Sequence, residues 1–254
     1  MKKKQDNIRA TIAMPLYKAK EIVWLALESL CNQVTDEDWE LVIAEEQFDD
    51  FAGISVFKQY EKKLKAAGMV NLVYIPVFDR ISLAEKWRLI AQHSAGELFF
   101  LQAADAYSPS DWIDRASKKM DLSQCDFYHR PNRHFYNIKN GKMVLYDSEA
   151  PRTHMAQVHL TENIAKLPEK KVWRGVDNYL LSSVPGCKKK LDRSPVEGLA
   201  TDGYNVISIH RHQIYNKLYL EKIKHKGIYH QPKKRLQQIV PAYVADKLEK
   251  MKEA

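Results

Sequence analysis

The sequence has few cysteines and no long hydrophobic run. The three cysteines, Cys31, Cys125 and Cys187, are odd in number and far apart, which argues against a disulfide framework or a zinc site. No stretch approaches the roughly 20 apolar residues that a membrane-spanning helix needs. The charged segment 1–7 is not followed by an apolar stretch long enough for a signal peptide. These absences predict a cytoplasmic protein.

Internal repeats and low-complexity linkers are also absent from the 254 residues. The chain is 45% hydrophobic and 28% charged, which is typical of a globular protein with one substantial core. The formal net charge is +8, and basic residues gather at 188–193 and 217–235. This surplus favours an anionic partner, such as nucleic acid, anionic lipid or a nucleotide diphosphate. The alternative is a solvated basic surface.

The first half of the chain alternates between strand and helix patterns. Apolar runs predict strands at 8–14, 39–44, 70–77 and 98–101. Helical patterns follow these strands, at 21–33, 54–67, 82–94 and 109–119. Ser82 and Glu85 form a capping-box pattern at the start of the third helix. Strands separated by single helices indicate βαβ units and a mostly parallel sheet.

The second half has a different pattern. Asn140-Gly141 is a two-residue turn signal, which predicts a hairpin over 135–146. The stretch from Lys217 onward is basic and is expected to be helical or irregular. Further short elements are expected between these regions: helices at 162–166 and 177–183, and a strand at 205–210.

Polar residues follow three of the predicted strands. Ligands of open α/β sheets bind beyond the carboxyl ends of the strands. Three exits are therefore of interest: Pro15–Lys18, Glu45–Glu46 and Gln102–Asp105. Acids at two such exits are costly to crowd together unless they bind a cation or a polar ligand. The alternative is that Glu45 and Glu46 lie in a solvated loop and Asp105 caps the next helix.

Residues 8–115 resemble the N-terminal half of family-2 glycosyltransferases. The resemblance is carried by the order of four segments: IRATIAMPLY, EIVWLALESLCNQ, WELVIAEE and SLAEKWRLIAQHSAGELFFLQAADAYSPSDWI. It implies an α/β fold of the GT-A type, with a mostly parallel central sheet and helices on both sides. It further implies a single GT-A domain over 1–254, with a nucleotide-sugar-binding half at 1–120 and an acceptor-binding half at 121–254.

The resemblance implies a set of donor-binding residues in the first half. Pro15 and Tyr17 would line the nucleotide base pocket. Glu45 falls where the family usually has an aspartate that contacts the base or ribose. Lys86 and Arg88 lie on the helix facing the donor, where cations suit the diphosphate. The alternative for these two cations is a polar helix face.

The resemblance is weakest at the metal site. The family's Asp-x-Asp would fall on Gln102-Ala103-Ala104, so both usual acids are missing and the adjacent Asp105 remains. By resemblance, Asp105 binds the donor and a divalent metal, Mn²⁺ or Mg²⁺, with a late histidine completing the site. His210 fits that role by position, and its imidazole would suit manganese better. The alternatives are a structural His210-x-His212 pair, and lysine and arginine acting in place of the metal.

The resemblance also implies a catalytic base in the second half. Asp177 lies at the start of an apolar helical run, where a carboxylate would deprotonate the acceptor hydroxyl. Its alternative role is a helix cap. Trp173 and Arg174 are predicted to bind the acceptor, although a buried tryptophan explains Trp173 equally well.

The expected function is transfer of a sugar from a nucleotide sugar, such as a UDP-sugar, to an acceptor hydroxyl with inversion. Two acceptors remain open: hydroxymethylated DNA of the phage type, which the basic second half suits, and a cell-surface glycan. A different reading is a catalytically inactive module that binds nucleotide or nucleic acid. A nucleotidyltransferase is disfavoured, because the loop after the first strand lacks glycine.

Overall fold

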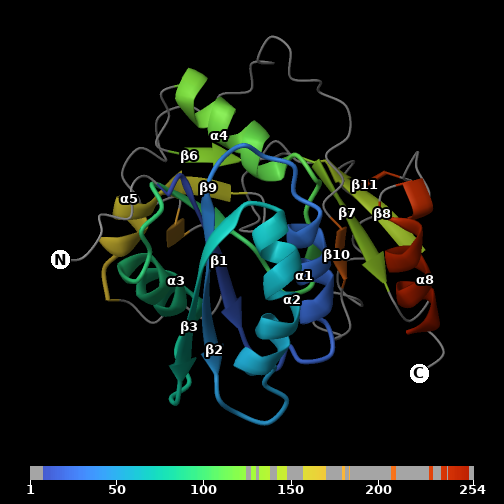
Figure 1. Ribbon diagram of the computed structural model, residues 1–254, viewed down its shortest axis with the longest axis horizontal. Coiled ribbons are helices and arrows are strands. Elements are labelled where there is room, and N and C mark those ends of the chain that lie inside the picture. The colour runs from blue at the N-terminus through green and yellow to red at the C-terminus, as the bar shows by residue number, and fades with distance from the viewer. Residues whose placement is uncertain are drawn as a thin grey trace.

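The computed structural model describes residues 8–123 and then shorter stretches, at 127–129, 132–137, 142–147, 157–169, 179–180, 183, 207–209, 229–230, 236–238 and 240–251. Its first half alternates strand and helix in the predicted order (Figure 1). These elements are β1 (Ala10–Leu16), α1 (Val23–Cys31), β2 (Trp39–Glu46), α2 (Ile54–Ala66), β3 (Met69–Val77), α3 (Leu83–Gln92), β4 (Leu98–Leu101), β5 (Ala106–Tyr107) and α4 (Trp112–Ser123).

The central sheet has six strands in the order β3-β2-β1-β4-β9-β6. β1 to β4 are parallel to one another, as the alternating pattern predicts. β9 (Gln157–Leu160) pairs antiparallel with β4 and with β6 (Phe127–His129). The prediction of a mostly parallel sheet is therefore confirmed. Because β6 and β9 come from the second half of the chain, the sheet crosses the boundary expected at residue 120.

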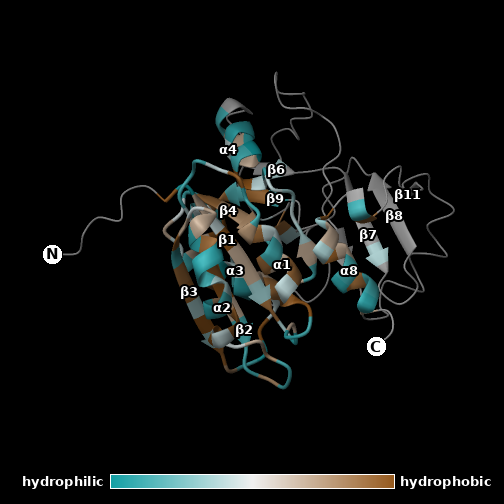
Figure 2. Cartoon of the chain, turned by 45° about the vertical axis from the view of Figure 1, so that its right-hand side comes forward, coloured by the Kyte–Doolittle hydropathy of each residue, from teal (hydrophilic) through white to brown (hydrophobic). Residues whose placement is uncertain are grey.

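Helices cover both faces of this sheet. On one face, apolar side chains of α1, α2 and α4 pack against alternate strand residues such as Ile12 and Ile43. On the other face, α3 and α5 (Thr161–Ala165) pack against the intervening residues, such as Ala13 and Val42. Burial on both faces explains why the strands read as continuous apolar runs. Figure 2 shows these strands as brown ribbons behind helices with teal residues.

A second sheet has the order β11-β8-β7-β10-β5. The hairpin predicted around residue 140 is present as β7 (Asn132–Asn137) and β8 (Lys142–Asp147), which pair antiparallel. β10 (Ile207–Ile209) lies between β7 and β5, parallel to the first and antiparallel to the second. β11 (Tyr229–His230) pairs with β8. β5, which directly follows β4 in the chain, is thus the edge strand of this second sheet.

The C-terminal helix α8 (Ala242–Lys250) follows a short 3₁₀ helix (Leu236–Gln238) and packs beside α1. Lys247 places its Nζ 3.8 Å from the ring centroid of Trp24 on α1. Tyr243 donates a hydrogen bond to Glu28 and accepts one from Asn32. The end of the described chain is thereby tied to the first helix. In the part of the chain that the structure describes, no helix is both long and apolar enough to cross a bilayer.

Gly96 occupies a tight position before β4. A Cβ at this residue would lie 2.6 Å from the backbone of Ala10 and Thr11 and from the Thr11 hydroxyl. Gly96→Ala will therefore lower the free energy of unfolding by about 1–3 kcal/mol, the usual cost of overpacking. Urea denaturation measures this loss. Val34→Ala is the control, because Val34 is exposed. An unchanged midpoint for Gly96→Ala would contradict the close approach.

Candidate functional site

The exits of β1 and β2 meet at one edge of the central sheet, where Leu16 pairs with Glu45. Side chains of a strand alternate between its two faces. In β2, Ile43 packs with the helices α1 and α2, whereas Ala44 packs with α3. By the same alternation, Glu45 lies on the α2 side of the sheet and Glu46 on the α3 side. These two adjacent acids therefore meet different surroundings.

Glu45 is engaged with the start of α2. Its carboxylate accepts hydrogen bonds from the backbone N–H of Ala52 at 2.6 Å and of Gly53 at 2.9 Å, and from the Tyr74 hydroxyl at 2.7 Å. Burial, together with the hydrogen bond to Glu45, raises the pKa of Tyr74 to about 12. Gly53 has a φ of 74°, a conformation that glycine adopts without strain. The carboxylate of Glu45 thus fixes the loop that leads into α2.

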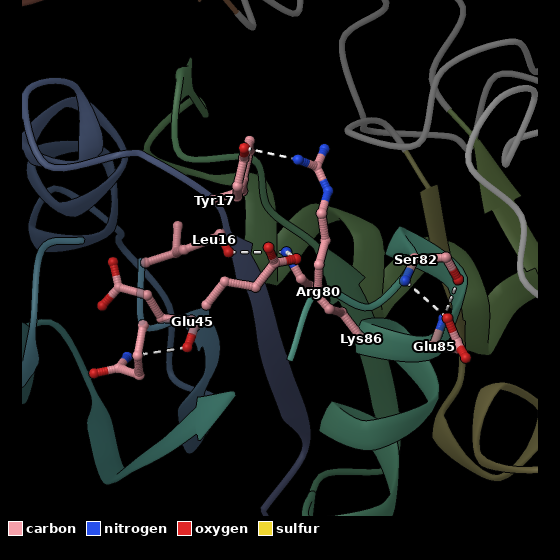
Figure 3. Close-up of polar contacts among 9 residues, drawn as sticks. Leu16, Tyr17, Glu45, Arg80, Ser82, Glu85 and Lys86 are labelled. Carbon is pink, nitrogen blue, oxygen red and sulfur yellow. Dashed lines mark hydrogen bonds and ion pairs between the residues drawn. The ribbon is translucent and has the colours of Figure 1, made fainter. Parts of the chain in front are cut away.

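Glu46 forms a buried ion pair with Lys86 of α3. The Lys86 Nζ lies 2.6 Å from Glu46 Oε1, and the two side chains are 6% and 2% exposed. The same Nζ donates to the carbonyl oxygen of Leu16 at 2.9 Å (Figure 3). Burial lowers the pKa of Lys86, and the Glu46 carboxylate acts in the opposite direction. Lys86 therefore connects the exits of β1 and β2 to α3.

The capping box of α3 sets the position of Lys86. Ser82 accepts a hydrogen bond from the backbone N–H of Glu85, and the Glu85 carboxylate accepts one from the backbone N–H of Ser82. This reciprocal pair, visible in Figure 3, fixes the first turn of the helix and the loop before it. The capping-box prediction is confirmed. Lys86 directly follows Glu85, so the capping box also fixes the backbone position from which the Lys86 side chain extends.

One oxygen of this buried pair has no partner among the described residues. Oε2 of Glu46 is buried and accepts no hydrogen bond from the part of the chain that the structure describes. A buried carboxylate oxygen without a donor is costly, and an N–H or O–H group from a bound molecule would remove that cost. The expectation that the two acids lie in a solvated loop is wrong, because both are buried residues of β2. Glu46 thus has a buried acceptor oxygen that no described group of the chain uses.

Tyr17 follows β1 and is partly exposed, with two cations beside it. The guanidinium carbon of Arg80 lies 4.4 Å from the Tyr17 ring centroid, and Arg80 Nη1 donates to the Tyr17 hydroxyl at 2.8 Å. The Lys86 Nζ is 5.7 Å from the same centroid. Figure 3 shows Arg80 reaching from the loop between β3 and α3 toward Tyr17. Pro15, the other predicted base-pocket residue, is half-buried within β1 and pairs with Ala44.

Arg88 does not join this cluster. It forms an ion pair with Glu169 at 2.7 Å, in the segment that follows α5. Positions two apart on an α-helix are separated by about 200° around its axis, so Lys86 and Arg88 leave α3 in nearly opposite directions. The structure thus brings Tyr17 and Lys86 together and places Arg88 elsewhere.

The exit of β4 is shaped by Gln102. This residue is 2% exposed. Its amide nitrogen donates to the carbonyl oxygens of Ala103 and Ala106, both at 3.0 Å, and its amide oxygen accepts the Ser108 hydroxyl at 2.7 Å. Both polar atoms of the side chain are therefore bonded to the segment from Ala103 to Ser108. Gln102 therefore stabilises the turn after β4, at a position where the family resemblance implied an acidic residue.

Asp105 is half-buried in this turn. The expectation that it caps the following helix is wrong, because β5 intervenes and α4 begins at Trp112. β10 runs antiparallel to β5, with Ser208 opposite Ala106, the neighbour of Asp105. The strand that precedes His210 thus lies beside Asp105, although His210 itself is outside the described residues. Among the described residues, no group of three or more histidine, cysteine, aspartate or glutamate side chains could hold a metal.

Three other predicted site residues, Trp173, Arg174 and Asp177, also lie outside the described residues. Their roles stay predictions. Two members of the observed cluster, Arg80 and Glu46, are not among the predicted donor-binding residues. Glu46 had a signal in the sequence, the acidic pair at the exit of β2, but the family resemblance points to Glu45. Arg80 had a weaker signal: a basic residue two positions before a helix-capping serine, at the exit of β3.

No protein-family model and no curated protein matches this sequence. Among solved structures, the chain is similar to S. aureus TarS 1–349 in complex with UDP, with a TM-score of 0.56 and 13% identity over 80% of this chain and 60% of that chain. The TarS 1–349 complex with UDP-GlcNAc gives a TM-score of 0.55 and 12% identity over 81% and 59% of the two chains.

The chain spans about 60% of the TarS 1–349 chain that it matches. At this level of identity, the likeness concerns the fold. The parallel sheet of β1 to β4, with helices on both faces, corresponds to the GT-A fold of TarS. The predicted fold class is therefore confirmed: this chain has a GT-A-type α/β fold.

Proposed function

We propose that the chain is a glycosyltransferase that binds a nucleotide sugar at the exits of β1 and β2. The observation that carries this proposal is the cluster of Tyr17, Arg80, Lys86 and Glu46, with a buried carboxylate oxygen that has no partner among the described residues. The cluster lies at the carboxyl edge of the parallel strands, where ligands of open α/β sheets bind. The TarS structures of the same fold contain UDP and UDP-GlcNAc, which supports this choice of ligand.

Each member of the cluster has a chemical role in this proposal. The Tyr17 ring is a flat surface on which a base stacks. Glu46 Oε2 accepts a hydrogen bond from the imide N–H of uracil or from a ribose hydroxyl. Lys86 supplies the counter-charge of the buried Glu46 carboxylate, with its Nζ 2.6 Å from Oε1. Together these roles favour a UDP-sugar as the donor.

The transfer step depends on the second half of the chain. Asp177 is proposed as the base that removes the proton of the acceptor hydroxyl while that oxygen attacks the anomeric carbon and the nucleotide diphosphate leaves. Trp173 and Arg174 are proposed to bind the acceptor. Hydroxymethylated DNA and a cell-surface glycan remain the two acceptor classes, because both depend on the basic segment from 188 to 235, which lies almost entirely outside the described residues.

A thermal-shift screen with UDP-, GDP- and TDP-sugars tests the donor. We expect a UDP-sugar to raise the melting temperature, because a ligand at one hundred times its dissociation constant adds about 2.7 kcal/mol of stability. Glu46→Gln should weaken the binding of UDP about tenfold or more, because the amide oxygen stays with Lys86 and the amide NH₂, a donor, then faces the donor group of the ligand. Calorimetric titration of the variant with UDP measures that loss.

Glu40→Gln is the matched control for Glu46→Gln. Glu40 is also a buried glutamate of β2, but it lies at the opposite end of the strand. We expect this variant to bind UDP as the wild type does, even where its own melting temperature falls. Equal affinity of Glu46→Gln and wild type for UDP would contradict the role given to Glu46. A screen without any shift would contradict the nucleotide-sugar proposal itself.

A catalytically inactive nucleotide-binding module is the second candidate. It is favoured by Gln102 and Ala104, which replace both acids of the expected Asp-x-Asp. Donor hydrolysis separates the two candidates, because glycosyltransferases release nucleotide diphosphate slowly when water replaces the acceptor. Release of UDP from the donor that passes the screen would support the enzyme. Tight binding without release, in the presence or absence of candidate acceptors, would support the inactive module.

A further inference from the structure

Among the described residues, the exit of β4 does not offer the set of ligands that a divalent cation needs. Mg²⁺ and Mn²⁺ require several oxygen or imidazole ligands to replace their water. Gln102, at the position of one expected acid, already uses its amide oxygen for the Ser108 hydroxyl. Ala104, at the position of the other, has no ligand atom in its side chain. Of the predicted ligands, Asp105 is the one carboxylate at this exit, and the residues here do not fit the metal site that the family resemblance implies.

Cations gather around Tyr17 instead. The Lys18 Nζ lies 5.9 Å and the Arg80 guanidinium carbon 4.4 Å from the Tyr17 ring centroid. Both residues are exposed, whereas Lys86 is buried and paired with Glu46. Lys18 has a φ of 49°, unusual for a residue with a side chain. Two exposed positive charges thus flank the ring on which we propose that the base stacks.

These two charges match those of the donor. The diphosphate of a nucleotide sugar carries about two negative charges near neutral pH, and charge-assisted hydrogen bonds from lysine and arginine to phosphate are among the strong ones. A base that stacks on the covered face of Tyr17 displaces the Arg80 guanidinium from that face. The displaced guanidinium belongs to an exposed side chain and pairs with the phosphate oxygens.

We infer that this site neutralises the donor diphosphate with Arg80 and Lys18, so that nucleotide binding does not require a divalent cation. The inference rests on the proposed function and assigns the charge of that same site. It concerns binding, and it names no step of the transfer. The competing arrangement is a cation held by Asp105 with His210.

Calorimetric titration of the full chain with UDP, in EDTA and then in Mn²⁺, tests the inference. We expect the dissociation constant to differ by less than about threefold between the two conditions. Arg80→Gln should weaken UDP binding about tenfold, the effect of losing a charge-assisted hydrogen bond. Its affinity for uridine should not fall, because uridine has no phosphate and its base no longer has to displace Arg80 from Tyr17. Lys18→Gln should show the same contrast between UDP and uridine with a smaller loss.

Lys118→Gln is the control for net charge. Lys118 lies on α4, is exposed and pairs with Asp114, so we expect its loss to leave UDP binding unchanged. UDP binding that appears only with Mn²⁺ would overturn the inference and leave the proposed function standing. Metal-free UDP binding that is insensitive to both Arg80→Gln and Lys18→Gln would also overturn it. Absence of UDP binding in both conditions would overturn the proposed function, and the inference with it.

Discussion

Lys86→Met will lower the free energy of unfolding by about 3–5 kcal/mol, because it leaves the buried carboxylate of Glu46 without its counter-charge. The two side chains are 6% and 2% exposed, so water does not replace the lost partner. The variant also loses the hydrogen bond from Lys86 to the carbonyl oxygen of Leu16. Urea denaturation and thermal melting measure the effect, and we expect the melting temperature to fall by roughly 10 °C.

The double variant Lys86→Met with Glu46→Leu separates stability from binding. Replacing both members of a buried ion pair by apolar residues of similar volume is often neutral for stability. We therefore expect the double variant to recover most of the loss while failing to bind UDP, because it has no acceptor at residue 46. Wild-type stability in the single variant would show that the ion pair is not buried in solution. Wild-type UDP binding in the double variant would remove Glu46 from the nucleotide site.

Glu40→Ala is expected to cost about 3 kcal/mol or more of stability. Glu40 is fully buried. Its carboxylate accepts hydrogen bonds from the Thr11 hydroxyl at 2.7 Å, from the backbone N–H of Gly96 at 3.0 Å and from that of Ala95. Removal of the carboxylate takes the acceptor from the buried Thr11 hydroxyl and leaves the Gly96 N–H with only its longer bond to Thr11 Oγ1, at 3.2 Å. A buried donor without an acceptor costs about 1–3 kcal/mol, and the loss of the buried side chain adds to that cost. Urea denaturation at constant pH measures the loss.

Glu40→Gln provides the control for this prediction. Glutamine keeps one acceptor oxygen at nearly the same place, so the loss should be clearly smaller than that of Glu40→Ala. Both variants should keep the shift in melting temperature that a nucleotide sugar produces, because Glu40 lies at the end of β2 remote from Tyr17. Equal stabilities of Glu40→Ala and wild type would contradict the hydrogen-bond network that joins β1, β2 and the start of β4.

Local patterns were sufficient to predict the layered α/β half of the molecule. β4 begins and ends where the apolar run 98–101 does, and α3 begins with the predicted capping box. The hairpin of β7 and β8 follows from its turn signal. The predicted strand ends were less accurate, because β2 extends through Glu46 whereas the prediction ended it at Ala44. The acids at its end are polar, and only their burial identifies them as strand residues.

The antiparallel pairings were not predictable in the same way. β5 and β10 have two and three residues, respectively, too few for a periodic pattern to identify a partner. β9 pairs with β4 across more than fifty residues of chain. The contact between α8 and α1 joins the two ends of the described chain. Such pairings depend on the closure of long loops and on competition among several strands, which no local window of sequence contains.

For the candidate site, sequence patterns were enough to predict that polar residues follow β1, β2 and β4, and that these exits share one edge of the sheet. Which of these residues meet depends on how the elements pack. Adjacent strand residues point to opposite faces, so Glu45 bonds the start of α2 while Glu46 pairs with Lys86 on α3. On α3, the rotation of the helix between residues 86 and 88 likewise directs Lys86 toward Glu46 and Arg88 toward Glu169. Sequence proximity places such side chains on one element, but only packing against its neighbours fixes which face each one occupies.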